Sequence, residues 1–434
     1  MSGPTGHLVL VTTHYPPSSA AGARRPANLV AHFVGAGWRV SVIASAEAPR
    51  EWHDGAAGER LHLVPIPRQY RRATAPSPGA GPRPAATPTR RTAKWSGRQG
   101  RLRRQVVALQ AFPDLWRDTE LPMATACREA VGDGHRTLLY STAPPITAHQ
   151  AALRVAREVP GLPWVAEYRD PWIEPGTQRL RWSGTIMAPA SHLLIRRLVR
   201  RPDLHVGVSD GITGWLQRRG AAEVVTALNG IPDRLLRSAR KPVEPGVIRY
   251  LGEFYLGRDP EPLFATLGRL RAAGELPEGW RLELIGNVES ALGTATGELL
   301  VRNGLADWTT LSDRIPHDLA VARTASAGLL VLLAQRQPDQ IPNKVFEYLG
   351  SRRPILAVVD QGGETHRLLA SLGVDEFVLT ERSTDAEWDR VVAAAVGRSF
   401  DPAPWGADPA GLDGLATSRQ LGLVEQRCRG LLER

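Results

Sequence analysis

The chain has 434 residues, enough for two domains with full hydrophobic cores, and its 42% hydrophobic and 23% charged residues are ordinary for a soluble globular protein. Its only cysteines, Cys127 and Cys428, give no disulfide framework and no metal cluster, and they fit a reducing, cytoplasmic setting. The net charge of +10 suggests nucleic acid at first, but eleven basic and no acidic residues fall within residues 68–104, and the remainder is nearly neutral.

The segment 68–104 is rich in Pro, Gly, Ala and Thr and cannot bury enough apolar surface to order itself. We therefore predict a basic, disordered insertion. Tyr70 and Trp95 are the only aromatic residues of this segment, and they do not form the regular aromatic interleaving that base stacking uses, so we expect no nucleic-acid partner. An anionic membrane or an anionic acceptor is the partner that such a segment fits. The apolar run at 8–11 is too short for a signal peptide, and no stretch reaches transmembrane length. We expect a cytoplasmic protein, with membrane association as a further expectation.

The first half of the chain alternates strands and helices, which predicts a parallel sheet. A helix at 26–36 buries one face, and a second helix covers 146–158. A third helix, around 193–201, is basic and amphipathic, and it is either a solvated surface helix or one that faces a membrane. Strands are expected at residues 8–11, 39–43, 61–66, 137–140, 164–168, 204–208 and 224–228.

A second alternating series follows a polar, proline-containing linker at 235–246. The N-terminal domain is therefore predicted to span 1–234 and the C-terminal domain 247–397, with a helical tail at 398–434 that returns to the N-terminal domain. Helices are expected at 261–273, 293–304 and 318–325, and in the tail from 416. Strands are expected at residues 247–251, 281–285, 308–311, 329–333 and 355–359.

The most informative segment is 339–350, between the last two of these strands. The free amides at the start of its helix, with Lys344 beside them, suit an anionic phosphate. Glu347 lies one turn on, on the same face as Asn343, where a carboxylate can accept two sugar hydroxyls. This combination indicates a nucleotide-sugar site at the carboxyl end of a parallel sheet.

Four motifs follow one another along the chain: Tyr15-Pro-Pro with Gly22-Ala-Arg-Arg, Glu167-Tyr-Arg-Asp-Pro-Trp172, Asn229-Gly-Ile, and the acidic pair Asp339 and Glu347. In this order they resemble the motifs of retaining glycosyltransferases with the GT-B fold, of the family 4 type and its Arg-Asp-Pro-Trp branch. The resemblance covers most of the chain except the basic insertion. It implies an α/β fold with two Rossmann-like, doubly wound parallel-sheet domains facing across a cleft.

The resemblance implies roles for residues in the C-terminal domain. Glu347 matches the acid that binds the donor ribose hydroxyls, and Asp339 matches the catalytic acid that faces the transferred sugar. The diphosphate would be held by Asn343, Lys344 and Arg258. A glutamate, Glu253, stands where the family often has its first base.

The remaining donor residues follow from the same resemblance. Gly22 would let the N-terminal loop approach the diphosphate. Gly286 and Asn287 would line the cleft, and Arg314 would lie near the base.

The N-terminal domain supplies the acceptor side. Arg169 and Asp170 would orient the acceptor or the departing phosphate, or would form a purely structural ion pair. His14, Tyr15 and His149 are candidates to line the acceptor site, although histidines at such positions are more often structural.

The predicted function is transfer of a hexose from a UDP-, GDP- or dTDP-sugar to an acceptor hydroxyl, with retention and without a metal or other cofactor. The acceptor would be a sugar, a lipid-linked sugar or a small natural product. Two alternatives remain open. One is a GT-B nucleotide-sugar epimerase or sugar phosphorylase, and the other is a peripheral membrane or scaffold protein that acts through its basic insertion.

Overall fold

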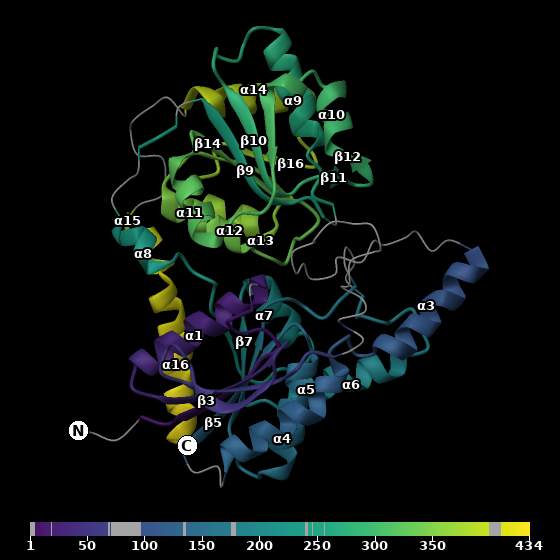
Figure 1. Cartoon of the computed structure of the whole chain (residues 1–434), viewed down its shortest axis with the longest axis vertical. Coiled ribbons are helices and arrows are strands. Elements are labelled where there is room, and N and C mark those ends of the chain that lie inside the picture. Colours follow the sequence, from purple (N-terminus) through teal and green to yellow (C-terminus); the bar gives the residue numbers. More distant parts are fainter. Residues whose placement is uncertain are drawn as a thin grey trace. The chain divides into compact units, whose positions relative to one another are not determined.

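The computed structural model describes residues 5–18, 20–67, 70, 97–132, 136–174, 179–238, 242–244, 246–255, 257–398 and 409–434. The chain divides into two compact units, each with its own sheet (Figure 1). The first comprises Met1–Leu228 and Leu421–Arg434, and the second comprises Asn229–Gln420. The chain thus leaves the first unit six residues before the predicted boundary at residue 234.

The first unit has an eight-stranded sheet in the order β3-β4-β2-β1-β5-β6-β7-β8. All neighbouring strands pair in parallel except β3, which is antiparallel to β4. Since the central strands are apolar on both faces, helices must cover both sides. The strands are β1 (His7–Val11), β2 (Arg39–Ala46), β3 (Arg50–Asp54), β4 (Arg60–Pro65), β5 (Thr137–Ala143), β6 (Trp164–Tyr168), β7 (Leu204–Gly207) and β8 (Val224–Thr226).

The helices α1, α4, α5 and α7 of this unit pack against the sheet. In α1, for example, Leu29, Val30 and Phe33 recur at helical spacing and are buried. The helices are η1 (Ala21–Ala23), α1 (Arg24–Gly35), α3 (Gly97–Ala111), η2 (Arg117–Thr119), α4 (Glu120–Val131), α5 (Thr147–Glu158), α6 (Ala188–Arg200) and α7 (Asp210–Gln217).

The C-terminal helix α16 (Thr417–Leu432) also contributes to the core of the first unit. Leu421, Val424 and Cys428 join the buried cluster that contains Leu29 and Phe33 of α1. The last residues of the chain therefore complete the hydrophobic core of the unit in which the chain begins.

The second unit has a six-stranded sheet in the order β13-β10-β9-β14-β15-β16, and every neighbouring pair is parallel. Numbered along this unit, the order is 3-2-1-4-5-6, the dinucleotide-binding arrangement. Its strand order reverses between β9 and β14, and open parallel sheets bind ligands at the carboxyl ends of the strands beside such a reversal. The strands are β9 (Val247–Glu253), β10 (Arg281–Asn287), β13 (Thr309–Ser312), β14 (Leu329–Ala334), β15 (Ile355–Val359) and β16 (Val378–Thr380).

A short hairpin and a set of helices complete the second unit. The hairpin pairs β11 (Ser290–Ala291) with β12 (Thr294–Ala295). The helices are α8 (Asp233–Arg237), α9 (Glu261–Ala272), α10 (Thr296–Arg302), η3 (Ala306–Trp308), α11 (His317–Ser326), α12 (Asn343–Ser351), α13 (Glu364–Ser371), α14 (Asp385–Arg398) and α15 (Pro409–Gly414).

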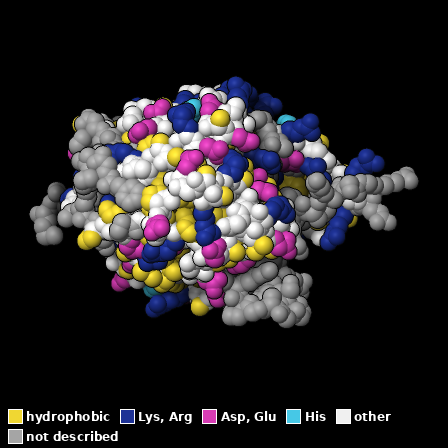
Figure 2. Space-filling model, turned by 90° about the horizontal axis from the view of Figure 1, so that it is seen from above, with side chains coloured by type: hydrophobic (Ala, Val, Ile, Leu, Met, Phe, Trp, Pro, Cys, Tyr) yellow, Lys and Arg dark blue, Asp and Glu magenta, His cyan; other side chains and the backbone are white. Residues whose placement is uncertain are grey.

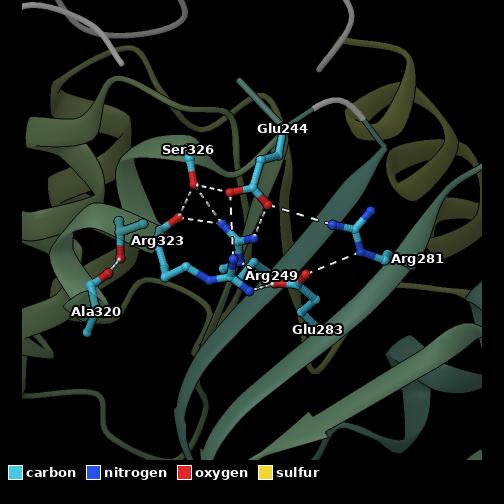
Figure 3. Close-up of polar contacts among 8 residues, drawn as sticks. Glu244, Arg249, Arg281, Glu283, Ala320, Arg323 and Ser326 are labelled. Atoms are coloured by element: carbon cyan, nitrogen blue, oxygen red, sulfur yellow. Dashed lines mark hydrogen bonds and ion pairs between the residues drawn. The ribbon is translucent and has the colours of Figure 1, made fainter. Parts of the chain in front are cut away.

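A buried charge network lies in the amino-terminal half of this sheet (Figure 3). Arg249 of β9 is fully buried and donates to Glu283 of β10 at 2.6 Å and to Glu244 at 2.8 Å. Arg323 of α11 donates to Glu283 at 3.0 Å. Since the buried carboxylate of Glu283 and the half-buried carboxylate of Glu244 are both paired, the network fixes the residues that lead into β9 against the sheet.

Most sequence expectations about the elements are confirmed. Each predicted strand is present, its ends within a few residues of those expected. Several elements were not expected, among them β3, β16 and the helices α4, α7, α13 and α14, and the helix predicted at 293–304 is a hairpin followed by α10. Within the predicted insertion, residues 97–104 belong to helix α3, while residues 68, 69 and 71–96 lie outside the described part of the chain.

Candidate functional site

Two glycines face each other at the carboxyl end of the second sheet. Gly252 of β9 and Gly286 of β10 are register partners on neighbouring strands. A Cβ atom on Gly286, whose φ is +127°, would lie only 1.9 Å from the Gly252 carbonyl oxygen. Only glycine therefore fits at Gly286, and neither glycine places a side chain at these strand ends, beside the point where the strand order reverses.

Lys344 stands in the first turn of α12, and its side chain extends to the carboxyl end of β9. A Cβ atom on Gly252 would lie only 1.9 Å from Lys344 Nζ, so the ammonium lies directly against the backbone of Gly252. The ammonium donates to the Leu251 carbonyl and lies 5.1 Å from the centroid of the Tyr250 ring. The end of β9 thus holds the Lys344 ammonium through a carbonyl and an aromatic face.

Arg258 is a second cation in the loop that follows β9. It is only 7% exposed, and its guanidinium lies 4.3 Å from the centroid of the Tyr255 ring. Its Nη2 donates to the Tyr255 hydroxyl at 3.1 Å, but within the described residues its buried Nε has no hydrogen-bond partner. A buried guanidinium whose Nε–H makes no hydrogen bond within the described residues is suited to an anionic ligand.

The two cations affect each other electrostatically. Burial and the nearby charge of Arg258 lower the pKa of Lys344 to about 7, against the opposing effect of Glu347 and Glu253. Arg314, which follows β13 and is exposed, lowers the pKa of Lys344 further. The Lys344 ammonium therefore lies among both cations and carboxylates, and a diphosphate bound beside it would favour its protonated form.

The remaining predicted donor residues border these cations. Glu347, one turn after Asn343 on α12, has a side chain only 12% exposed, and its Oε1 lies 3.9 Å from His317 Nε2 at the start of α11. Asp339 is half-buried in the loop between β14 and α12, and Asn287 is half-buried at the end of β10. All of these positions lie at the carboxyl ends of strands in one sheet.

In the first unit, Arg169 holds the loop that contains Gly22. Its guanidinium donates to the Gly22 carbonyl at 2.5 Å, to the Pro144 carbonyl and, through Nε at 3.4 Å, to the Ala143 carbonyl. A Cβ on Gly22 would lie 3.0 Å from Arg169 Nη1 and 3.2 Å from His14 Cδ2. Arg169 therefore joins three chain segments through their backbone.

Asp170 and His14 lie beside Arg169. Desolvation raises the pKa of Asp170 to about 6 against the opposing charge of Arg169, although its side chain reaches solvent, which weakens the effect. Burial, followed by the charge of Arg169, lowers the pKa of His14 to about 4, so His14 is neutral at pH 7. The His14 ring contacts Trp116 edge to face, 5.0 Å between centroids.

The two other predicted acceptor residues are buried. The Tyr15 hydroxyl donates to Glu59 Oε1 at 2.6 Å. His149 is fully buried on α5, 2.8 Å from the Ser141 hydroxyl through Nδ1, and burial lowers the pKa of His149 to about 3. Both side chains make contacts that stabilise the fold, and their acceptor roles stay predictions.

Sequence reasoning missed several contributors to these surroundings. Tyr250 and Tyr255 support the two cations, and His317 lies next to Glu347. The pair Gly252 and Gly286 was partly visible, since each glycine ends an apolar run in its strand. The contacts of Tyr250 and His317 depend on packing between elements distant in sequence and left no signal.

A buried ion pair in the first unit was also missed. Arg25 Nε donates to Glu167 Oε1 at 3.0 Å, and its other nitrogens donate to the carbonyls of Leu228 at 2.6 Å and Ala227 at 3.0 Å. These are the last residues of the first unit before the chain passes to the second. Arg25 thus fixes the end of that segment to β6.

The described residues contain no cluster of three or more His, Cys, Asp or Glu side chains placed to hold a metal ion. None of the described helices has the length and apolar composition needed to cross a lipid bilayer. On the face drawn in Figure 2, Lys and Arg side chains are interspersed with Asp and Glu.

Neither a protein-family model nor a curated protein matches the sequence. Solved structures do match in fold over nearly the whole chain. An α,α-trehalose-phosphate synthase (UDP-forming) from Burkholderia xenovorans, in complex with glucose-6-phosphate, matches with a TM-score of 0.63 and 10% identity, covering 98% of this chain and 100% of that one.

Two further structures match similarly. A glycosyltransferase from Rickettsia africae has a TM-score of 0.61 at 8% identity and covers 99% of both chains. A sucrose-phosphate synthase from Thermosynechococcus elongatus has a TM-score of 0.56 at 14% identity, covering 99% of this chain and 94% of that one. At these identities the likeness shows the fold, and the chain has the GT-B fold of two Rossmann-like domains. The assignment to family 4 stays a prediction.

Proposed function

We propose that this chain is a glycosyltransferase that takes a sugar from a nucleotide diphosphate sugar. The observation that carries the proposal is the pair of cations, Arg258 and Lys344, at the point where the second sheet reverses its strand order. A buried guanidinium whose Nε has no partner among the described residues and an ammonium with a lowered pKa would form a binding site for a diphosphate. Glu347, one turn beyond, would accept the ribose hydroxyls.

The same two cations would stabilise the leaving group without a metal. As the bond between the sugar and the diphosphate breaks, negative charge grows on the leaving phosphate, and Arg258 and Lys344 would stabilise it. The departing phosphate would take the proton of the acceptor hydroxyl, so a strong protein base is not required. Retention of the anomeric configuration follows from the resemblance stated above, and Asp339 would face the transferred sugar.

The acceptor side of the proposal lies in the first unit. Arg169 holds the Gly22 loop through backbone carbonyls, so we infer that it shapes this loop and that Asp170 beside it orients the acceptor. A sugar, a sugar phosphate or a lipid-linked sugar would suit this side. The structural neighbours include one enzyme solved with glucose-6-phosphate and one from E. coli bound with UDP-2-fluoro glucose, which makes UDP-glucose the first donor to test.

The proposal is tested by incubating the protein with UDP-, GDP- and dTDP-sugars, with and without sugar acceptors, and following the anomeric protons by NMR. We expect release of the nucleoside diphosphate and an α-linked product from an α-linked donor, at the same rate in EDTA. Conversion of a nucleotide sugar to its epimer without an acceptor would indicate the epimerase alternative instead. Absence of turnover and of binding with every nucleotide sugar would refute the proposal.

A further inference from the structure

Helix α3 presents an apolar stripe to solvent. Leu102, Val106 and Leu109 are 68%, 43% and 53% exposed. Their spacing of four and three residues places them on one face of the helix, within an arc of roughly 60° at about 100° per residue. The opposite face holds Ala108 and Ala111, which pack in the core of the first unit. The apolar stripe is therefore additional to the face that anchors the helix.

Arginines border this stripe on both sides. Arg101 and Arg103 are exposed and lie about 100° to either side of Leu102 around the helix axis. The helix contains no acidic residue from Gly97 to Ala111. An exposed apolar stripe with an exposed arginine on either side suits a helix that lies at the boundary between lipid headgroups and acyl chains.

Helix α6 extends the same kind of surface. The backbone N–H of Ile186, just before α6, donates to Gln105 Oε1 of α3 at 2.7 Å, so the two elements lie side by side (Figure 1). Ile186 is 57% exposed and Leu193 of α6 is 47% exposed. Arg197 and Arg200 follow Leu193 by four and seven residues, and both are exposed. This helix also has no acidic residue.

We propose that α3 and α6 form a docking surface for an anionic phospholipid bilayer. The arginines would contact the headgroup phosphates, and Leu102, Leu109 and Ile186 would enter the headgroup boundary. The charge is complementary to anionic lipid, whereas a polyanion such as nucleic acid would leave the exposed leucines in water. The proposal goes beyond sugar transfer and does not depend on it.

The test is sedimentation of the full chain with vesicles of phosphatidylcholine alone and of phosphatidylcholine with 30% phosphatidylglycerol. We expect binding only to the anionic vesicles. The double variants Leu102→Glu/Leu109→Glu and Arg101→Gln/Arg103→Gln should each lower the partition coefficient at least about tenfold, since one basic residue near an anionic surface contributes roughly fivefold.

Matched control variants carry the same changes elsewhere. Val301→Glu/Leu423→Glu and Arg382→Gln/Arg390→Gln replace exposed residues away from α3 and α6, and they should bind as the wild type does. Unchanged thermal midpoints would show that the α3 variants are folded.

The proposal is overturned if the wild type ignores anionic vesicles or if the α3 variants bind as tightly as the controls. In the second case, loss of binding on deletion of 71–96 would assign the interaction to the basic segment. Binding of the wild type to a protein partner through Leu102 and Leu109, with no vesicle binding, would also overturn it.

Discussion

The lowered pKa of Lys344 predicts that donor binding depends on pH in a defined direction. In the empty site, burial and Arg258 hold the pKa of this ammonium at about 7 rather than its ordinary 10.5. A bound diphosphate favours the protonated form and raises that pKa, so binding takes up a proton. Affinity should therefore be full below about pH 7 and should fall as the pH rises above it.

The size of the effect follows from the fraction of protein with Lys344 already protonated. That fraction falls from about three quarters at pH 6.5 to about 3% at pH 8.5, so the dissociation constant should rise roughly 20-fold. UDP-glucose is the ligand of choice because its diphosphate keeps the same charge over this range. Isothermal titration calorimetry in buffers of different ionisation enthalpy would also count the proton taken up.

The control is Lys344→Met, which should bind weakly at both pH values and without proton uptake. A second readout separates binding from folding. Because the buried ammonium destabilises the empty fold below its ordinary pKa, the Met variant should be at least as stable as the wild type in urea at pH 7. A wild-type affinity that is constant from pH 6.5 to 8.5, or a slope that survives in Lys344→Met, would refute the reasoning.

Two other substitutions test contacts seen in the second unit. Gly252→Ala places a Cβ 1.9 Å from Lys344 Nζ, so the ammonium must move, and we expect donor affinity to fall about tenfold (a loss of roughly 1.4 kcal/mol) with the far-ultraviolet spectrum unchanged. Affinity equal to that of the wild type would show that Lys344 does not bind from this position. Arg249→Ala leaves Glu283 buried without its main partner and should lower the free energy of unfolding by about 3–5 kcal/mol in urea. A loss under about 1 kcal/mol, the range of exposed pairs, would mean that the network is not held as it is drawn in Figure 3.

Much of the fold could be predicted from the sequence because buried parallel strands are short apolar runs. Residues 329–333 and 355–359 are examples, and both lie in strands of the second sheet. Alternation of such runs with amphipathic helices fixed the fold class. Short or weakly apolar elements were missed, such as β3, which is largely polar and lies at the edge of its sheet.

Only those parts of the site whose residues are close together in the sequence could be predicted. Lys344 and Glu347 stand in one helical turn, so their common face followed from spacing alone. The arrangement of Tyr250 and Gly252 against Lys344 joins residues more than ninety positions apart, and no local pattern encodes such a contact. For residues 97–104 the local pattern was misleading. Their composition and charge predicted a disordered insertion, but they belong to helix α3, which Ala108 and Ala111 anchor in the core of the first unit.

The central claim is that Glu347, Lys344 and Arg258 hold a nucleotide diphosphate. It is tested most directly by titrating the wild type, Glu347→Gln and the exposed control Glu376→Gln with a nucleoside diphosphate in its ribose and 2′-deoxyribose forms. The account predicts that the wild type and control prefer the ribose form about tenfold, as expected for a hydrogen bond to a charged group, and that Glu347→Gln loses this preference. A preference that persists in Glu347→Gln, or no nucleotide binding by the wild type, would contradict it.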